Sequence, residues 1–245
     1  MSAPVLLKNI EDARRRLVGI IRPTPLMQSA TLARILDADV RIKPENKQKT
    51  GSFKIRGAYN RIVTLSDEEK KRGVVTASAG NHGQALAYAA TRAGVTATIV
   101  MPTNAAIAKI DATRSYGQSV VLEGGDYQAA RAAAAKICSE RGAIFVDAYD
   151  DPYIVAGQGT VGLEIADEIT PDVVMVPVGG GGLIAGIAAA LATRAPAAEV
   201  IGVGTEFAGQ PVAQHHEFLA EMTVLFFRVG QVGAQAGLGD QRAGG

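Results

Sequence analysis

Lys54 stands out among the residues of this chain that could do chemistry. It falls in the first turn of a helix predicted over residues 53–62, directly after Ser52, a good capping residue. The N-terminus of a helix carries about +0.5 charge, so an ammonium is disfavoured there and we expect a lowered pKa. A neutral amine is a nucleophile. The residues around it are small or flat, as a planar ligand requires: Gly51, Phe53 and Gly57.

A run of four glycines is the second candidate site. It connects a strand predicted over residues 173–178 to a helix predicted over residues 183–193, and its members are Gly179, Gly180, Gly181 and Gly182. Backbone N–H groups in such a turn can converge on one anion, and the helix N-terminus adds a positive field. A turn without a ligand is the alternative, but four glycines cost much conformational entropy if only a turn is needed. We therefore predict a phosphate site.

The same glycines also allow a different ligand. Gly180-x-Gly182-x-x-Ala185 fits a dinucleotide-binding pattern, with Glu206 as the acid that would hold a ribose. This match is loose and short, so NAD binding is our second hypothesis. Residues 157–162 fit the pattern as well, but no convincing strand precedes them, and we interpret them as the start of a helix.

A polar loop forms the third candidate site, between a strand predicted over residues 74–77 and a helix predicted over residues 81–93. Its residues are Ser78, Ala79, Gly80, Asn81 and His82. Its donors suit a carboxylate, and the Asn81 amide can both donate to and accept from a ring substituent. We interpret His82 as a hydrogen-bonding residue rather than a catalytic one, because no carboxylate partner lies near it in the sequence.

One lysine amine, one phosphate site and one carboxylate site together point to a phosphorylated carbonyl cofactor. The amine would hold the carbonyl covalently while an amino acid binds beside it. Pyridoxal 5'-phosphate fits this description.

The elements that must position these residues alternate regularly from residue 73 onward. Further strands are predicted over residues 96–101, 119–122, 143–145 and 199–203, and further helices over residues 105–116, 127–141 and 160–169. Continuous apolar strands separated by long helices indicate parallel strands buried on both faces, so the fold class is α/β. Before residue 73 we expect helices over residues 9–20 and 29–36, a strand over residues 39–44, and a helix opened by a capping box at Ser66 and Glu69.

After Val203 this alternation decays. Residues 224–227 could form one more strand, and residues 233–245 contain five glycines and few apolar residues. We expect that tail to be frayed or disordered.

Composition excludes several classes of function. The chain has 245 residues, of which 47% are apolar and 20% charged, and its net charge of +1 argues against nucleic acid as a partner. No apolar run approaches the roughly 20 residues that span a bilayer. Cys138 is the single cysteine and cannot form an internal disulfide. We expect a cytoplasmic protein without a membrane partner.

Four motifs, in the right order, closely resemble the serine/threonine dehydratase family, fold-type II pyridoxal phosphate enzymes like the β subunit of tryptophan synthase. They occupy residues 52–58, 78–85, 157–160 and 179–182. The resemblance implies that Lys54 is the Schiff-base lysine and that Phe53 packs near the cofactor. It places the cofactor phosphate at residues 179–182 beside Leu183, the ring hydroxyl at Asn81, and the substrate carboxylate at residues 78–82.

The resemblance also implies an architecture of two three-layer α/β domains with mostly parallel sheets. We expect residues 1–66 and 148–245 to form a large cofactor-binding domain, residues 67–147 a small domain, and the protein to be a homo-oligomer. The resemblance runs from about residue 10 to residue 203, so we expect the C-terminal part of the large domain to be incomplete. Gly204 and Thr205 stand where the family begins a divalent-cation site, so we predict no metal.

The implied reaction is α,β-elimination of L-threonine, with L-serine as a second candidate substrate, to a 2-oxo acid and ammonia, and Lys54 is the implied base at the α-carbon. Such a reaction serves amino-acid metabolism, as in isoleucine biosynthesis. Racemases of the same family carry a second hydroxyl at the position of Ala79, which favours a dehydratase here. A serine racemase-like enzyme and a non-catalytic remnant of the fold that acts as an interaction protein are the remaining alternatives.

Overall fold

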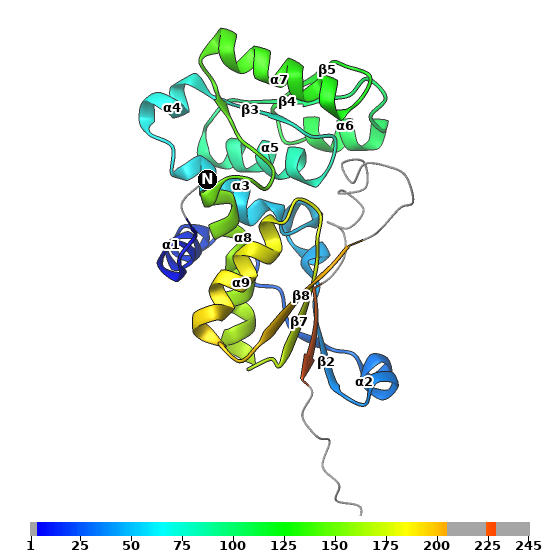
Figure 1. Ribbon diagram of the computed structural model, residues 1–245. Helices are drawn as coiled ribbons and strands as arrows, with labels where there is room; N and C mark the ends of the chain where they lie inside the picture. Colours follow the sequence, from blue (N-terminus) through cyan, green and yellow to red (C-terminus); the bar gives the residue numbers. More distant parts are fainter. Residues whose placement is uncertain (1–3, 205–223, 229–245) are drawn as a thin grey trace, which may run out of the picture.

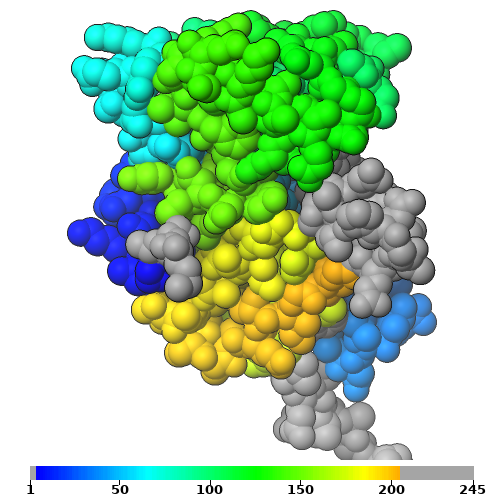
Figure 2. Space-filling model, turned by 45° about the horizontal axis from the view of Figure 1, so that its top comes forward, coloured from blue at the N-terminus to red at the C-terminus, as the bar shows by residue number. Residues whose placement is uncertain are grey.

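The computed structural model describes residues 4–204 and 224–228, and two β-sheets organise them (Figure 1). The four-stranded sheet has the order β5 (Ser119–Leu122), β4 (Ala97–Met101), β3 (Val74–Ala77), β6 (Ile144–Phe145). The five-stranded sheet has the order β1 (Met27–Gln28), β2 (Asp39–Lys43), β9 (Val224–Arg228), β7 (Val173–Pro177), β8 (Glu199–Val203). The half that contains the four-stranded sheet, drawn in green, lies over the half that contains β8, drawn in yellow and orange (Figure 2).

Nine α-helices lie in the described residues. They are α1 (Leu7–Leu17), α2 (Ala30–Leu36), α3 (Lys54–Val63), α4 (Asp67–Arg72), α5 (Asn81–Ala93), α6 (Ile107–Arg114), α7 (Tyr127–Arg141), α8 (Pro152–Glu168) and α9 (Gly182–Arg194). Short 3-10 turns occupy Glu45–Lys47 and Lys49–Gly51. The caps expected at Ser29 and Ser66 are present, since both side chains accept from backbone N–H groups of the first turn.

The four-stranded sheet is parallel throughout, as its uninterrupted apolar strands predict. Successive residues of β3 point to opposite faces: Val74 joins the core beneath α5, whereas Val75 joins the core beneath α7. The two helices accordingly cover opposite faces (Figure 1). Both are rich in alanine on their buried sides, which lets them lie close to the strands.

The five-stranded sheet is mixed. Its β7 and β8 pair in parallel, and the remaining neighbours pair antiparallel. Val174 and Val176 of β7 pack under α8 and α9. A strand expected over residues 224–227 is confirmed as β9, inserted between β2 and β7. The expected frayed tail, residues 233–245, lies outside the described residues.

Most expected elements are confirmed with ends shifted by less than one helical turn, but the prediction for α8 is wrong. The helix begins at Pro152 rather than at residue 160, so residues 157–162 lie inside it and do not start it. Asp151 caps it through the N–H groups of Tyr153 and Ile154, and proline suits the first helical position because its missing N–H has no partner there anyway.

Glycine is required inside α8 by close helix packing. A Cβ on Gly157 would lie 2.5 Å from the carbonyl oxygen of Arg56 in α3, and one on Gly159 would lie 2.8 Å from the carbonyl oxygen of Gly186 in α9. Both contacts are with backbone, which cannot rotate away as a side chain can. The glycines therefore set how closely α3, α8 and α9 approach one another.

A group of charged side chains joins α3 and α8 to β2 and to the 3-10 turn Glu45–Lys47. The guanidinium of Arg56 is fully buried, donates to both carboxylate oxygens of Glu45 at 2.8 Å, and donates to those of Glu164 at 2.6 and 2.9 Å. Lys43 is also fully buried, and its Nζ lies 2.7 Å from Oε2 of Glu164. The charges of Arg56 and Lys43 are therefore balanced by those of Glu45 and Glu164. Burial opposes the charge, but Glu45 and Glu164 raise the pKa of Arg56 above its ordinary value.

Arg56→Met is expected to lower the free energy of unfolding by about 3–5 kcal/mol, because it leaves buried Glu45 and partly buried Glu164 with one lysine to balance both. Arg194→Met, which breaks a half-exposed pair with Asp167, should cost about 0–1 kcal/mol. Urea unfolding followed by circular dichroism measures both. Equal losses in the two variants would contradict the role given to Arg56.

None of the helices in residues 4–204 combines the length and hydropathy that a bilayer crossing requires.

Candidate active site

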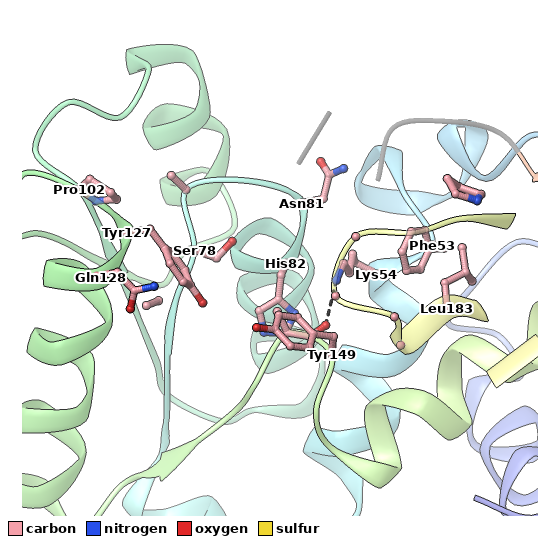
Figure 3. A pocket seen from close by; sticks show the side chains of 18 of the residues that line it. Phe53, Lys54, Ser78, Asn81, His82, Pro102, Tyr127, Gln128, Tyr149 and Leu183 are labelled. Atoms are coloured by element: carbon pink, nitrogen blue, oxygen red, sulfur yellow. Dashed lines mark hydrogen bonds between the residues drawn. The ribbon is translucent and has the colours of Figure 1, made fainter. Parts of the chain in front are cut away.

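A cavity of about 440 Å³ lies between the two halves of the protein and gathers most of the predicted site residues (Figure 3). One wall comes from the loops that leave the carboxyl ends of the four-stranded sheet. The other comes from the start of α3 and the loop between β7 and α9. Of the predicted residues, these line it: Phe53, Lys54, Ser78, Ala79, Asn81, His82, Gly179, Gly180, Gly181, Gly182 and Leu183. Gly80 does not, although it directly precedes α5.

Lys54 is the first residue of α3, as the sequence predicts within one residue. The prediction of a cap at Ser52 is wrong, because Phe53 is the N-cap residue of α3 and makes no side-chain cap hydrogen bond. Oγ of Ser52 accepts instead from the backbone N–H of Lys54, two residues on, at 3.4 Å. The Nζ of Lys54 donates to the backbone carbonyl of Ala148 at 2.8 Å, drawn as a dashed line in Figure 3, and lies 5.4 Å from the centre of the Phe53 ring. The amine therefore sits in the cavity wall at a defined position.

The chain approaches Lys54 through two residues in the left-handed region. Thr50 has φ of 65° and Gly51 has φ of 74°. This conformation is unfavourable for threonine, and such backbone strain tends to cluster at functional sites. This backbone conformation at Thr50 and Gly51 directs the chain into α3, which begins at the edge of the cavity.

The four-glycine run forms the turn from β7 into α9. Gly181 has φ of 86°, a conformation that L-residues with a side chain rarely adopt. A Cβ on Gly180 would lie 2.2 Å from the ring of Tyr149, and one on Gly182 would lie 3.1 Å from the Tyr149 carbonyl. Two glycines thus make room for Tyr149, and the whole turn exposes backbone N–H groups at a helix N-terminus, which suits an anion.

The loop after β3 brings two unsatisfied polar atoms to the cavity. The Nδ2 atom of Asn81 and the Nδ1 atom of His82 are buried without a hydrogen-bond partner, and both residues line the cavity. Buried polar groups in native proteins are normally paired. These atoms are therefore suited to a polar ligand in the cavity.

The electrostatics of His82 agree with a hydrogen-bonding role. Its Nε2 lies 3.3 Å from the carbonyl oxygen of Val146. Burial, and then the positive charge of Lys54, lower the pKa of His82 to about 3. The imidazole is neutral at physiological pH and can donate one hydrogen bond and accept another.

Sequence reasoning missed the residues that complete the cavity on the side of the four-stranded sheet. One of them is Ala77, the last residue of β3. The others are Pro102, Asn104, Asp126, Tyr127, Gln128, Ala148 and Tyr149. These others follow the carboxyl end of β4, β5 or β6, just as the predicted loop follows β3. Ligands of open parallel sheets bind outside these strand ends, so the strand assignments already contained the signal.

Comparisons with known proteins match a range of this chain that includes the residues of the cavity. The sequence pattern of the family described as "Pyridoxal-phosphate dependent enzyme" matches residues 17–224. That range extends beyond residue 203, where we expected the resemblance to end. An L-threonine ammonia-lyase of Thermotoga maritima is 50% identical over 204 residues, which cover 82% of this chain and 51% of the relative. A catabolic L-threonine dehydratase of Staphylococcus aureus is 49% identical, covering 82% of this chain and 59% of the relative.

Solved structures give the same picture. The processed form of threonine deaminase isoform 2 from Solanum lycopersicum has a TM-score of 0.78 at 40% identity, covering 82% of this chain and 58% of that one. Serine racemase from Dictyostelium discoideum has a TM-score of 0.79 at 35% identity, covering 82% and 66%. The chain spans between about half and two thirds of the length of these relatives.

Both the motifs and the fold therefore lead to one assignment. The predicted α/β architecture of fold-type II is confirmed by these structural neighbours. The chain belongs to the pyridoxal-phosphate dependent enzyme family.

Proposed function

We propose that this protein is a pyridoxal phosphate-dependent ammonia-lyase that converts L-threonine, and also L-serine, to a 2-oxo acid and ammonia. One observation carries the proposal: the Lys54 amine lies in the same cavity as the glycine turn and the unpartnered polar atoms of Asn81 and His82. A nucleophile, an anion site, a donor at Asn81 and an acceptor at His82 match the carbonyl, phosphate and ring substituents of the cofactor.

The residues present fit the cofactor. Backbone N–H groups of residues 179–182 would hold its phosphate, since side chains are absent there and the start of α9 adds a positive field. The unpaired Nδ2 of Asn81 would donate to the ring hydroxyl. Phe53 and Leu183 would pack beside the ring, and they lie on one side of Lys54 in Figure 3.

When bound, the cofactor would supply an electron sink for the α-carbon of the amino acid. The chain's own residues would do the rest. Lys54 would take the proton from the α-carbon at its Nζ, within a wall that already fixes this atom. The loop of residues 78–82 would bind the substrate carboxylate through donors other than His82. Neutral His82 donates from Nε2 to the Val146 carbonyl and would offer Nδ1 to the ligand as an acceptor. Loss of the β-hydroxyl and later hydrolysis would give 2-oxobutanoate from threonine.

Elimination is favoured over racemisation by Ala79. This residue lines the cavity but has no group that could carry a proton. A racemase needs a second acid or base on the opposite face of the α-carbon. Serine racemases are nevertheless among the similar structures, so D-serine is the product to measure for the alternative function.

We also propose a division into a small domain, residues 67–147, and a large domain, residues 1–66 and 148–245. The four-stranded sheet lies wholly in the first and the five-stranded sheet wholly in the second, which supports this division. We propose further that the protein works in the cytoplasm as a homo-oligomer.

Pyridoxal phosphate added to the purified protein is expected to give a visible absorption band and, after borohydride reduction, a pyridoxyl group on the peptide that contains Lys54. Lys54→Ala should lose both signals because it removes the nucleophile. Lys136→Ala, at an exposed surface lysine, should keep them. Absorption spectra and peptide mass spectrometry provide the readout. An unchanged band in Lys54→Ala would remove the cofactor assignment.

Formation of 2-oxobutanoate from L-threonine is expected in the presence of the cofactor, and Lys54→Ala should reduce its rate by about 10²–10⁴-fold or more, the range typical of a lost general base. A coupled NADH assay measures the product. If the cofactor attaches but neither 2-oxobutanoate nor D-serine forms, the non-catalytic alternative holds.

The neutral state of His82 predicts a pH dependence of stability. Its pKa is about 3 in the folded protein against 6.5 ordinarily. Between these two values the unfolded chain binds a proton at His82 and the folded protein does not. The contribution of neutral His82 is complete above pH 6.5 and is lost as pH falls toward 3. His82→Gln should therefore lose less stability than the parent between about pH 7.5 and about pH 5 in urea unfolding. Equal losses would show that His82 does not titrate in this way.

A further inference from the structure

The segment between β6 and α8 contacts the candidate site, although it lies outside the four motifs. It leaves the four-stranded sheet after Phe145 and enters α8 at Pro152. On the way it lines the cavity with Ala148 and Tyr149. The carbonyl of Ala148 accepts from Nζ of Lys54 at 2.8 Å, which is a contact between residues 94 positions apart. What holds this carbonyl in place therefore also decides where the amine lies.

Asp147 holds it. One carboxylate oxygen, Oδ1, accepts from the backbone N–H of Tyr149 and from that of Asp150, both at 3.0 Å. This is the arrangement by which aspartate closes a local turn on its own backbone. The turn encloses residue 148, so the direction of the Ala148 carbonyl is fixed by the Asp147 side chain.

The carboxylate is itself anchored from α7. Its Oδ2 accepts from Nη1 of Arg131 at 3.1 Å, and the Arg131 guanidinium lies 5.1 Å from the centre of the Phe145 ring. Burial alone would raise the pKa of Asp147, but the N–H groups of Asp150 and Tyr149 together with Arg131 hold it below its ordinary value. The turn therefore keeps its ionised acceptor at neutral pH.

The same turn reaches the other wall of the cavity. The Tyr149 ring occupies the space that a Cβ on Gly180 would need. The backbone of Tyr149 likewise approaches Gly182. The segment thus contacts both the Lys54 amine and the glycine turn, so its backbone conformation affects the position of each.

We propose that Asp147 is a positioning residue whose turn presents the Ala148 carbonyl as a docking point for the Lys54 amine whenever that amine is not bonded to the cofactor. The proposal rests on the proposed function and adds to it a residue outside all four motifs. The amine gives one N–H to the carbonyl, so its position relative to the cavity is set. Docking holds Nζ against the cavity wall, so it competes with the reaction of this amine with an electrophile.

The test uses the full chain without cofactor. Acetic anhydride acylates lysine amines that are free to react, and peptide mass spectrometry gives the ratio of labelling at Lys54 to labelling at Lys136. Asp147→Ala should raise this ratio by about tenfold, the worth of one hydrogen bond to a charged group. Asp147→Asn should stay near the parent, because its amide oxygen closes the same turn. Arg131→Met, which keeps the turn and loses only the anchor, should change the ratio little.

A second readout is the rate at which added pyridoxal phosphate attaches to Lys54 in stopped-flow absorption. Asp147→Ala should raise this rate for the same reason, and Asp147→Asn should stay near the parent. If Asp147→Ala does not fold by circular dichroism, Asp147→Ser, whose hydroxyl closes a weaker turn, should give an intermediate labelling ratio. The proposal is overturned if a folded Asp147→Ala or Asp147→Ser labels like the parent, or if Asp147→Asn behaves like Asp147→Ala.

The labelling ratio separates this proposal from the proposed function. It needs neither cofactor nor turnover, so it still reports on the docking point if the parent binds no pyridoxal phosphate. Failure of attachment in the parent would instead remove the proposed function.

Discussion

Arg56 carries a charge into a place from which water is excluded, and it can do so because Glu45 and Glu164 approach it from two other elements. Breaking such a group is costly, since it leaves an uncompensated charge behind. The consequence for the site is geometric. Arg56 lies two residues after Lys54 on α3, so the network that neutralises the arginine also fixes the first turn of the helix that presents the amine.

Close helix packing extends this constraint to the glycine turn. α3 meets α8 at Gly57 and Gly157, and α8 meets α9 at Gly159 and Gly186, all through backbone contacts that tolerate no side chain. The N-terminus of α9 is where the glycine turn ends. One stack of three helices therefore holds both the amine and the anion site, and interiors packed this tightly transmit strain rather than absorb it.

The opposite wall has a different origin. In the parallel four-stranded sheet, all strands end at the same edge, and the loops that leave β3, β4, β5 and β6 meet there. The segment after β6 then crosses to the three stacked helices. There Tyr149 packs on the glycine turn, and the carbonyl of Ala148 accepts a hydrogen bond from the Lys54 amine. This crossing joins the two walls into one cavity.

Local sequence determined much of this arrangement. The alternation of apolar strands and helices, the caps at Ser29 and Ser66, and the three loops with Lys54, Asn81 and the four glycines are all visible in the chain, because each depends on neighbours a few residues away. The start of α8 was misjudged for a related reason. Glycine is unfavourable inside a helix, so the sequence pattern favours a helix start at residues 157–162, and only contact with other helices explains why glycines stand inside one.

Tertiary structure alone decided which of these loops face one cavity and why three charged side chains can gather around buried Arg56. It also decided that the turn closed by Asp147 brings the Ala148 carbonyl to Lys54. Each of these depends on residues far apart in the chain, such as Lys54 and Ala148 or Arg56 and Glu164. Burial is a property of the packed protein and changes the chemistry of a side chain, as the lowered pKa of His82 shows. The sequence alone determined the chemical groups and their local turns, and packing decided their distances and their charge states.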